Sequence, residues 1–211
     1  MEKQITSRQK QLLGIIYDLF STTGYPPSFE EMRESLNVAS NQSVIDLLEK
    51  LKKGNFIKKD EGARSLAIKP LGYEVLGRPA LAPILGTTTA GAPAEVIEIT
   101  GEWQKISSDV ARLDAEVFML RIFGDSMINA GIDDGDMVLV QSKKEFVSKE
   151  IVLADFGGES TIKRFISEDK PPYVYLKPEN PKYNNILFTD EVRLKGKVVS
   201  VFKNNQWKSV K

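Results

Sequence analysis

The sequence predicts a two-domain α+β protein, with a winged helix-turn-helix domain at residues 1–69, a linker at 70–81 and a mostly-β domain at 82–211. Three observations favour this division. The chain of 211 residues exceeds the usual size of one domain. Helical periodicity dominates its first third, whereas short runs rich in β-branched and aromatic residues recur after residue 82. A stretch rich in proline and glycine separates the two parts.

The first two predicted helices each begin with a capping box. Thr6 and Gln9 have that spacing ahead of an amphipathic run, which stops at Gly24. Ser28 and Glu31 repeat the spacing directly after two prolines, which block helix at their own positions. A short second helix is therefore expected after Ser28.

A third helix and a hairpin complete the predicted N-terminal domain. Either Ser40 or Asn41 can cap this helix, and Gly54 ends it. The runs 56–59 and 64–68 have strand composition and are separated by a turn. Three helices followed by a hairpin is the element order of a winged helix-turn-helix. The alternative is a small helical bundle with an ordinary polar cap.

The rest of the chain predicts an irregular linker followed by strands. The linker contains two prolines and two glycines between residues 70 and 79, which argues against regular structure there. Six later runs have the composition of strands: 117–123, 137–141, 150–156, 160–166, 173–176 and 196–203.

The third helix carries the residues expected to contact double-stranded DNA. In a helix-turn-helix the second helix of the pair lies in the major groove, and residues at its start reach base edges. Cations nearby bind phosphates. Because 29 basic residues balance 29 acidic ones, any positive field is local. The candidate contacts are Ser40, Asn41, Gln42, Ser43 and Ile45 for bases, and Lys52, Lys53 and Arg64 for phosphates.

Two residue types are missing from the sequence. Without cysteine there are no disulfides, thiolate metal sites or thiol nucleophiles, and without histidine there is no Ser-His-Asp triad and no imidazole base. The aspartates within residues 133–136 lack the spacing of an EF-hand and are interpreted as turn residues. We expect no metal and no cofactor, and any nucleophile needs a base other than histidine.

The N-terminal segment carries no sign of membrane targeting. It is polar, and the apolar run that follows is interrupted by Asp18, so neither a signal peptide nor a membrane helix of about 20 residues is expected. We expect a cytoplasmic protein.

One serine stands out within the segment IFGDSMINAGIDDGDMVLVQ, residues 122–141. Serine and aspartate in such a loop usually bond to their own backbone, so the local pattern alone is more typical of a turn. Loops on a rigid β scaffold also carry catalytic residues. The local sequence leaves Ser126 open as a turn residue or a nucleophile.

The strand predicted at 160–166 offers a base for such a nucleophile. Alternation places Lys163 and Arg164 on opposite faces, so one of these cations lies near apolar side chains. Arginine keeps its proton in proteins, whereas a lysine removed from water can lose it and accept another. Lys163 is therefore the candidate general base for Ser126, and backbone N–H groups around Ser126 are the candidate oxyanion donors. The alternative is a strand lysine whose amine reaches solvent.

Three motifs in these segments resemble the LexA family of self-cleaving bacterial repressors and, more broadly, UmuD-like proteins with a Ser-Lys peptidase domain. They are the block GDSMINAGIDDGDMVLV around Ser126, the TIKR segment that holds Lys163, and the pair Ala90-Gly91 within GTTTAGAPAE. The serine and lysine are separated by 163 minus 126, or 37, residues, which is similar to the family spacing. The resemblance covers nearly the whole chain.

The resemblance implies a nucleoid-associated repressor of SOS genes, which respond to DNA damage. Such a repressor binds operator DNA as a homodimer through its C-terminal domain, and a RecA filament stimulates it to cut its own Ala90-Gly91 bond. The strand at 196–203 resembles the family's dimer-forming strand. Residues 40–46 depart from the best-known family pattern, so no operator sequence is implied.

Other functions share parts of this pattern. A phage-type self-cleaving repressor would use the same residues. A DNA-binding regulator without peptidase activity would use the β domain only to dimerise or to bind an effector. A signal-peptidase-like enzyme also uses Ser-Lys chemistry, but it normally carries a membrane anchor.

Overall fold

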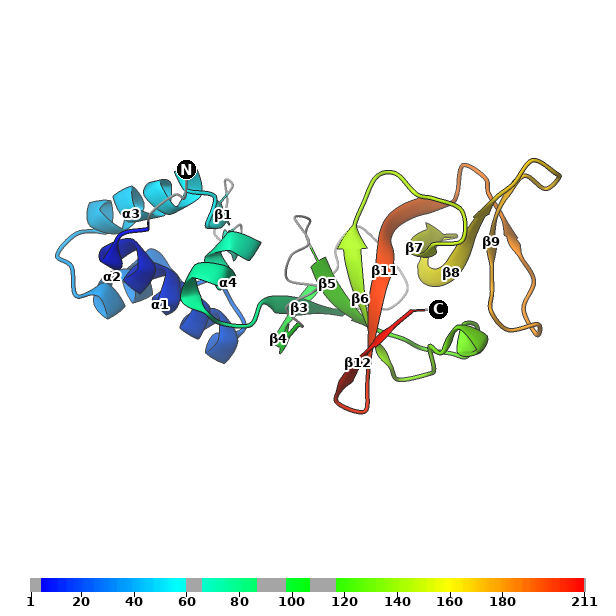
Figure 1. Ribbon diagram of the computed structural model, residues 1–211, viewed down its shortest axis with the longest axis horizontal. Helices are drawn as coiled ribbons and strands as arrows, with labels where there is room; N and C mark the ends of the chain where they lie inside the picture. Colours follow the sequence, from blue (N-terminus) through cyan, green and yellow to red (C-terminus); the bar gives the residue numbers. More distant parts are fainter. Residues whose placement is uncertain (1–4, 60–65, 87–97, 107–116, 211) are drawn as a thin grey trace. The chain divides into compact units, whose positions relative to one another are not determined.

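The computed structural model describes residues 5–59, 66–86, 98–106 and 117–210, which fall into two compact units (Figure 1). The first unit takes the described residues up to Ala82 together with 101–106, and the second takes the remainder. Helices make up most of the first unit and strands make up most of the second, so the predicted α+β class is confirmed. No helix in the described part of the chain is long and apolar enough to cross a membrane.

The first unit contains the three expected helices, α1 (Ser7–Thr23), α2 (Phe29–Leu36) and α3 (Asn41–Lys53). Both predicted capping boxes are present, with Thr6 and Ser28 as the caps. Each box satisfies backbone N–H groups that a helix start leaves unpaired. The helices bury one apolar core, formed chiefly by Leu12, Leu13, Ile16, Phe20, Met32, Leu36, Val44, Leu48 and Leu51.

The predicted hairpin consists of β1 (Ile57–Lys59) and β2 (Leu66–Ile68), which pair antiparallel. The turn between them lies outside the described residues. Three helices and a paired hairpin in this order are the elements of a winged helix-turn-helix.

The prediction of an irregular linker at 70–81 is wrong for its first half, which forms helix α4 (Pro70–Leu76). A proline at the first helical position costs no hydrogen bond, and its fixed φ suits a helix. Gly77 then ends the helix in the left-handed conformation. Gly72 is a packing residue, because a Cβ there would lie 2.4 Å from the carbonyl oxygen of Phe56.

The strands after residue 80 form one sheet in the order β10-β9-β8-β7-β11-β6-β5-β3-β4, with β12 paired to β11. β3 and β5 run parallel, whereas β5 to β9 and β11 are joined by antiparallel pairs. The bounds are β3 Leu81–Gly86, β4 Glu98–Lys105, β5 Val117–Arg121, β6 Met137–Ser142, β7 Ile151–Phe156, β8 Glu159–Ser167, β9 Val174–Lys177, β10 Ile186–Leu187, β11 Arg193–Lys203 and β12 Gln206–Ser209.

All six strands predicted in the second half are present, and β3, β4, β10 and β12 were not predicted. β10 is two residues long and β12 is mostly polar, so neither has a strand-like run of its own. The strand expected at 196–203 is β11, which pairs with β7 and then with β12 on one side and with β6 on the other. β11 is therefore paired on both sides at Gly196, at Lys197 and over residues 200–202.

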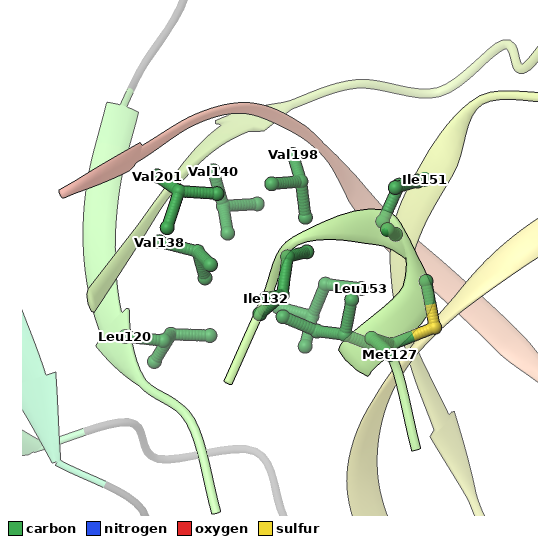
Figure 2. Close-up of a cluster of buried hydrophobic side chains, with 11 residues drawn as sticks. Leu120, Met127, Ile132, Val138, Val140, Ile151, Leu153, Val198 and Val201 are labelled. Carbon is green, nitrogen blue, oxygen red and sulfur yellow. The ribbon is translucent and has the colours of Figure 1, made fainter. Parts of the chain in front are cut away.

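Apolar side chains cover both faces of this sheet. Along β7, Ile151 and Leu153 join one buried cluster, and Val152 and Ala154 join the other. Figure 2 shows the first cluster, in which Met127 from the loop after β5 lies beside Leu153. The loop that carries Ser126 is thereby anchored in the core.

Candidate active site

The structure brings Ser126 and Lys163 together from distant parts of the chain. Ser126 lies in the loop between β5 and the 3-10 helix η1 (Ile128–Ala130), and Lys163 lies in the middle of β8. The Nζ atom of Lys163 is 2.9 Å from the Oγ atom of Ser126. This distance is within the range for proton transfer between a nucleophile and its base.

Lys163 is a buried amine with three oxygen neighbours. Lys163 is 7% exposed. Besides contacting Ser126, its Nζ donates to Thr161 Oγ1 (2.7 Å) and to the carbonyl oxygen of Ile162 (3.0 Å). A neutral amine has two N–H donors and one lone pair. When Thr161 and Ile162 accept the two N–H donors, the lone pair is left for the Ser126 hydroxyl.

Burial also changes the acidity of Lys163. Removal of the ammonium group from water lowers the pKa of Lys163 from 10.5 to about 8. A substantial fraction of the amine is therefore neutral at mildly alkaline pH. The prediction that Lys163, rather than Arg164, is the shielded cation agrees with this environment, since Arg164 instead pairs with Glu179.

The backbone around Ser126 forms a tight turn. Gly124 adopts φ +91°, a conformation that favours glycine, and its N–H donates to Asp134 Oδ1 at 2.7 Å. Met127, which directly follows Ser126, is 2% exposed, so its side chain anchors this turn in the core. The half-buried Ser126 thus occupies a turn and also faces a base, so the two interpretations of the sequence are compatible.

Two backbone donors next to this hydroxyl are available to a substrate. Within the described part of the chain, the N–H groups of Ser126 and Met127 have no hydrogen-bond acceptor. Unpaired N–H groups beside a nucleophile can stabilise the negative oxygen that forms when a carbonyl is attacked. This agrees with the expectation that the oxyanion donors lie around Ser126.

Asn180 is a residue of the site that local sequence patterns did not reveal. Its side chain, in the loop after β9, donates to the carbonyl oxygen of Asp125. Its motif, LKPEN, has the composition of a turn, and no local pattern relates it to a residue 55 positions earlier.

The aspartates that follow Ser126 bond within the fold. Asp136 Oδ2 accepts from the N–H of Asp133 at 2.8 Å, as expected of a turn, and Lys203 forms ion pairs with both carboxylates. The Oδ2 atom of each carboxylate thus already has a donor from the chain itself.

The polar start of α3 lies at the surface of the first unit. Ser40, Asn41 and Gln42 are exposed, and Ser43 and Ile45 are half-buried. Ser40, rather than Asn41, is the cap, and its Oγ accepts from the N–H of Ser43. These positions agree with the layout of a helix that reads DNA by its N-terminal turn.

The candidate phosphate contacts are only partly described. Lys52 and Lys53 are exposed in the last turn of α3, where Lys52 Nζ donates to the carbonyl oxygen of Lys59 (2.6 Å). Arg64 lies outside the described residues. The proposed cleavage site, Ala90 and Gly91, lies outside them as well.

Comparison with known proteins agrees with both halves of this description. Residues 2–65 match the LexA DNA binding domain, and residues 83–199 match the Peptidase S24-like family. The chain is 35% identical to the LexA repressor of Lactobacillus gasseri, over 97% of this chain and 99% of the relative. The chain belongs to the LexA repressor family. Similar LexA repressors come from Oenococcus oeni (36% identity, 94% of this chain and 98% of the relative) and Enterococcus faecalis (35%, 97% and 98%).

Family membership gives each half of the chain a role. The N-terminal half is a DNA-binding domain, and the C-terminal half is a serine peptidase domain of the kind that cleaves its own chain. The resemblance inferred from three short motifs is thereby confirmed over nearly the full length.

Proposed function

We propose that this protein is a cytoplasmic, nucleoid-associated repressor of SOS genes that is inactivated by cutting its own Ala90-Gly91 bond, with Ser126 as nucleophile and Lys163 as general base. The observation that carries this proposal is the contact of 2.9 Å between Ser126 Oγ and the buried Lys163 Nζ. In a chain without histidine, a buried lysine is a side chain that can be neutral near physiological pH and accept the proton.

The proposed reaction is an acyl transfer in two stages. Neutral Lys163 takes the hydroxyl proton of Ser126 while Oγ attacks the carbonyl carbon of Ala90, and the N–H groups of Ser126 and Met127 bind the resulting oxyanion. Lys163 then gives its proton to the amine of Gly91, which leaves. Water hydrolyses the ester between Ser126 and Ala90 by the same proton route, which frees the serine.

Self-cleavage requires a brake, because a tethered substrate has a high effective concentration. Protonation of Lys163 is one such brake, since a charged amine cannot accept the serine proton. A second is the placement of the segment that contains Ala90 and Gly91. We propose that a RecA filament on single-stranded DNA favours the cleavable placement of that segment.

Repression would require two copies of the DNA-binding domain. A homodimer through the C-terminal domain places two α3 helices on a two-fold operator, with the exposed Ser40, Asn41 and Gln42 facing base edges. Because residues 196, 197 and 200–202 of β11 are paired on both sides, a dimer formed at this middle part of the strand would use side chains on the sheet face and not backbone pairing. The remaining candidates, Ser43, Ile45, Lys52, Lys53 and Arg64, would complete the contact with bases and phosphates.

The test is to incubate the full chain with RecA, ATP and single-stranded DNA, and to measure fragment masses. We expect one fragment that ends at Ala90 and one that starts at Gly91, and an intact chain for Ser126→Ala. A wild-type chain that stays intact both with the filament and at pH of about 10 would refute the peptidase proposal. Cleavage at another bond would refute the assignment of Ala90 and Gly91.

A further inference from the structure

The loop after β9 contacts both sides of the Ser126 and Lys163 pair through two adjacent residues, Glu179 and Asn180. Glu179 accepts from the residue that follows the lysine, and Asn180 donates to the residue that precedes the serine. The proposed mechanism uses neither side chain. Their positions raise the question of what holds the nucleophile in register with its base.

Asn180 is a buried polar residue, 5% exposed, whose amide is fully bonded. Its Nδ2 donates to the carbonyl oxygen of Asp125 (3.0 Å) and to the Oδ2 atom of the same residue (3.1 Å), and its Oδ1 accepts from the N–H of Lys182 (3.1 Å). The site requires a donor and an acceptor on one short side chain. Aspartate would keep the acceptor and lose the donor, and alanine would lose both.

The bond to the Asp125 carbonyl fixes a direction as well as a position. A trans peptide is planar, so the C=O of Asp125 and the N–H of Ser126 lie in one plane and point in opposite directions. The N–H of Ile128 also donates to this carbonyl, at 3.2 Å. With two donors on the oxygen, the plane cannot rotate freely, and the unpaired N–H of Ser126 keeps one orientation.

Glu179 joins the same loop to the strand that carries the lysine. Its Oε1 accepts from Arg164 Nε at 2.5 Å, and its carbonyl oxygen accepts from the N–H of Asn129 at 2.9 Å. Arg164 directly follows Lys163 in β8. The two neighbouring residues therefore link β8 to both ends of the turn that contains Ser126.

We propose that Asn180 is a positioning residue for self-cleavage, which holds the Asp125 carbonyl so that the N–H of Ser126 faces the developing oxyanion. Glu179 anchors this brace to β8. The inference rests on the proposed roles of Ser126 and Lys163. Because Asn180 acts on the peptide that carries the oxyanion donor and does not contact the amine of Lys163, it affects the rate and not the protonation of the base.

The test is the pH–rate profile of unstimulated self-cleavage for the full chain with Asn180→Ala. We expect the plateau at high pH to fall about ten- to a hundredfold, the loss typical of a misplaced catalytic group. The midpoint of the profile should stay where the wild type has it. Asn180→Asp keeps the size of the side chain and removes the donor, so it should lose a similar factor.

Two control variants come from the same loop. Tyr183→Phe removes a hydrogen bond to the carboxylate of Asp125 and leaves the carbonyl contact intact, and Asn184→Ala changes an exposed amide. Both should keep most of the wild-type plateau. Circular dichroism and thermal unfolding show which variants fold, and if Asn180→Ala does not fold, Asn180→Asp carries the test.

Each outcome decides the inference. A wild-type plateau in the folded Asn180 variants would overturn it. A midpoint that moves with the plateau would also overturn it, because that result means a disturbed Lys163 and not a misplaced N–H. If the wild-type chain does not cut itself and behaves like the Ser126→Ala variant, both the proposed function and this inference are refuted. Normal wild-type cleavage together with undiminished Asn180 variants refutes the inference alone.

Discussion

The start of α3 and the turn around Ser126 are both short polar segments, but their side chains are held in different ways. At the start of α3, Ser40 bonds to Ser43, three residues away, and Gln42 bonds to Asp46, four residues away. At the turn around Ser126, three bonds that involve a side chain join residues 10, 37 and 55 positions apart in sequence. The first segment is held by bonds within its own helix, and the second is held by β8 and by loops that are distant in sequence.

This difference corresponds to two kinds of function. A DNA-reading surface needs exposed donors and acceptors on a stable helix, and local bonds are sufficient to provide them. A peptidase site needs a neutral lysine, and that requires burial among strands that meet only in the folded domain. Substitutions at the start of α3 should therefore change DNA binding and not cleavage, and substitutions near Ser126 should change cleavage and not DNA binding.

The largest expected effect is the loss of self-cleavage in Ser126→Ala and Lys163→Ala. Each removes one of the two groups that move the proton, so we expect the rate to fall at least about a thousandfold. Operator binding, measured by fluorescence anisotropy, should remain at the wild-type level because α3 is untouched. If either variant still cut itself at a comparable rate, the pair would not be the catalytic one.

A smaller effect concerns the stability of the peptidase domain. In the folded protein the pKa of Lys163 is lowered from 10.5 to about 8. Below pH 8 the folded protein therefore contains a charged, buried ammonium group, which lowers the free energy of unfolding. Lys163→Met should therefore raise the free energy of unfolding at pH 7 by on the order of 2–3 kcal/mol, since each pKa unit corresponds to about 1.4 kcal/mol. The gain in stability should shrink between pH 8 and 10.5, where the wild-type amine is largely neutral in the folded state and still largely charged in the unfolded state.

Chemical denaturation at several pH values measures this effect. Lys144→Met, at an exposed position of the same domain, is the matched control and should change stability little at any pH. A Lys163→Met variant no more stable than wild type at pH 7 would mean that the lysine carries no desolvation cost.

The smallest expected effect is on DNA affinity. Gln42→Ala removes an exposed amide at the start of α3, and we expect operator binding to weaken by about 1–2 kcal/mol. The loss should be at the low end for a base contact, because Gln42 must first release Asp46. Binding to unrelated DNA and the rate of self-cleavage should not change. An equal loss on both kinds of DNA would identify Gln42 as a phosphate contact instead.

The same contrast explains how much could be predicted from the sequence. The capping boxes of α1 and α2 and the cap of α3 depend on contacts between residues three positions apart, so the local sequence was sufficient to predict them. Helix α4 was missed because its proline and glycine are breakers in most contexts. Here the proline stands at the first helical position, and Gly72 is required by the close approach of Phe56.

The candidate site was only partly predictable, because its contacts join distant strands. Alternation along the strand at 160–166 identified a lysine near apolar groups, and a chain without histidine made it the candidate base for Ser126. No local pattern showed that the two side chains meet, and the family resemblance added the motifs and the spacing that support the pair. Asn180 was missed for the same physical reason, since its partner is 55 residues away and its own sequence has the composition of a turn.

The most direct test of the central claim is the rate of self-cleavage of the wild-type chain from pH 6 to about 10, without any activator. If a buried neutral Lys163 is the base, the rate should rise with pH, pass a midpoint near the lowered pKa of about 8, and level off above it. A rate that stays flat from neutral pH to about 10 would contradict the account.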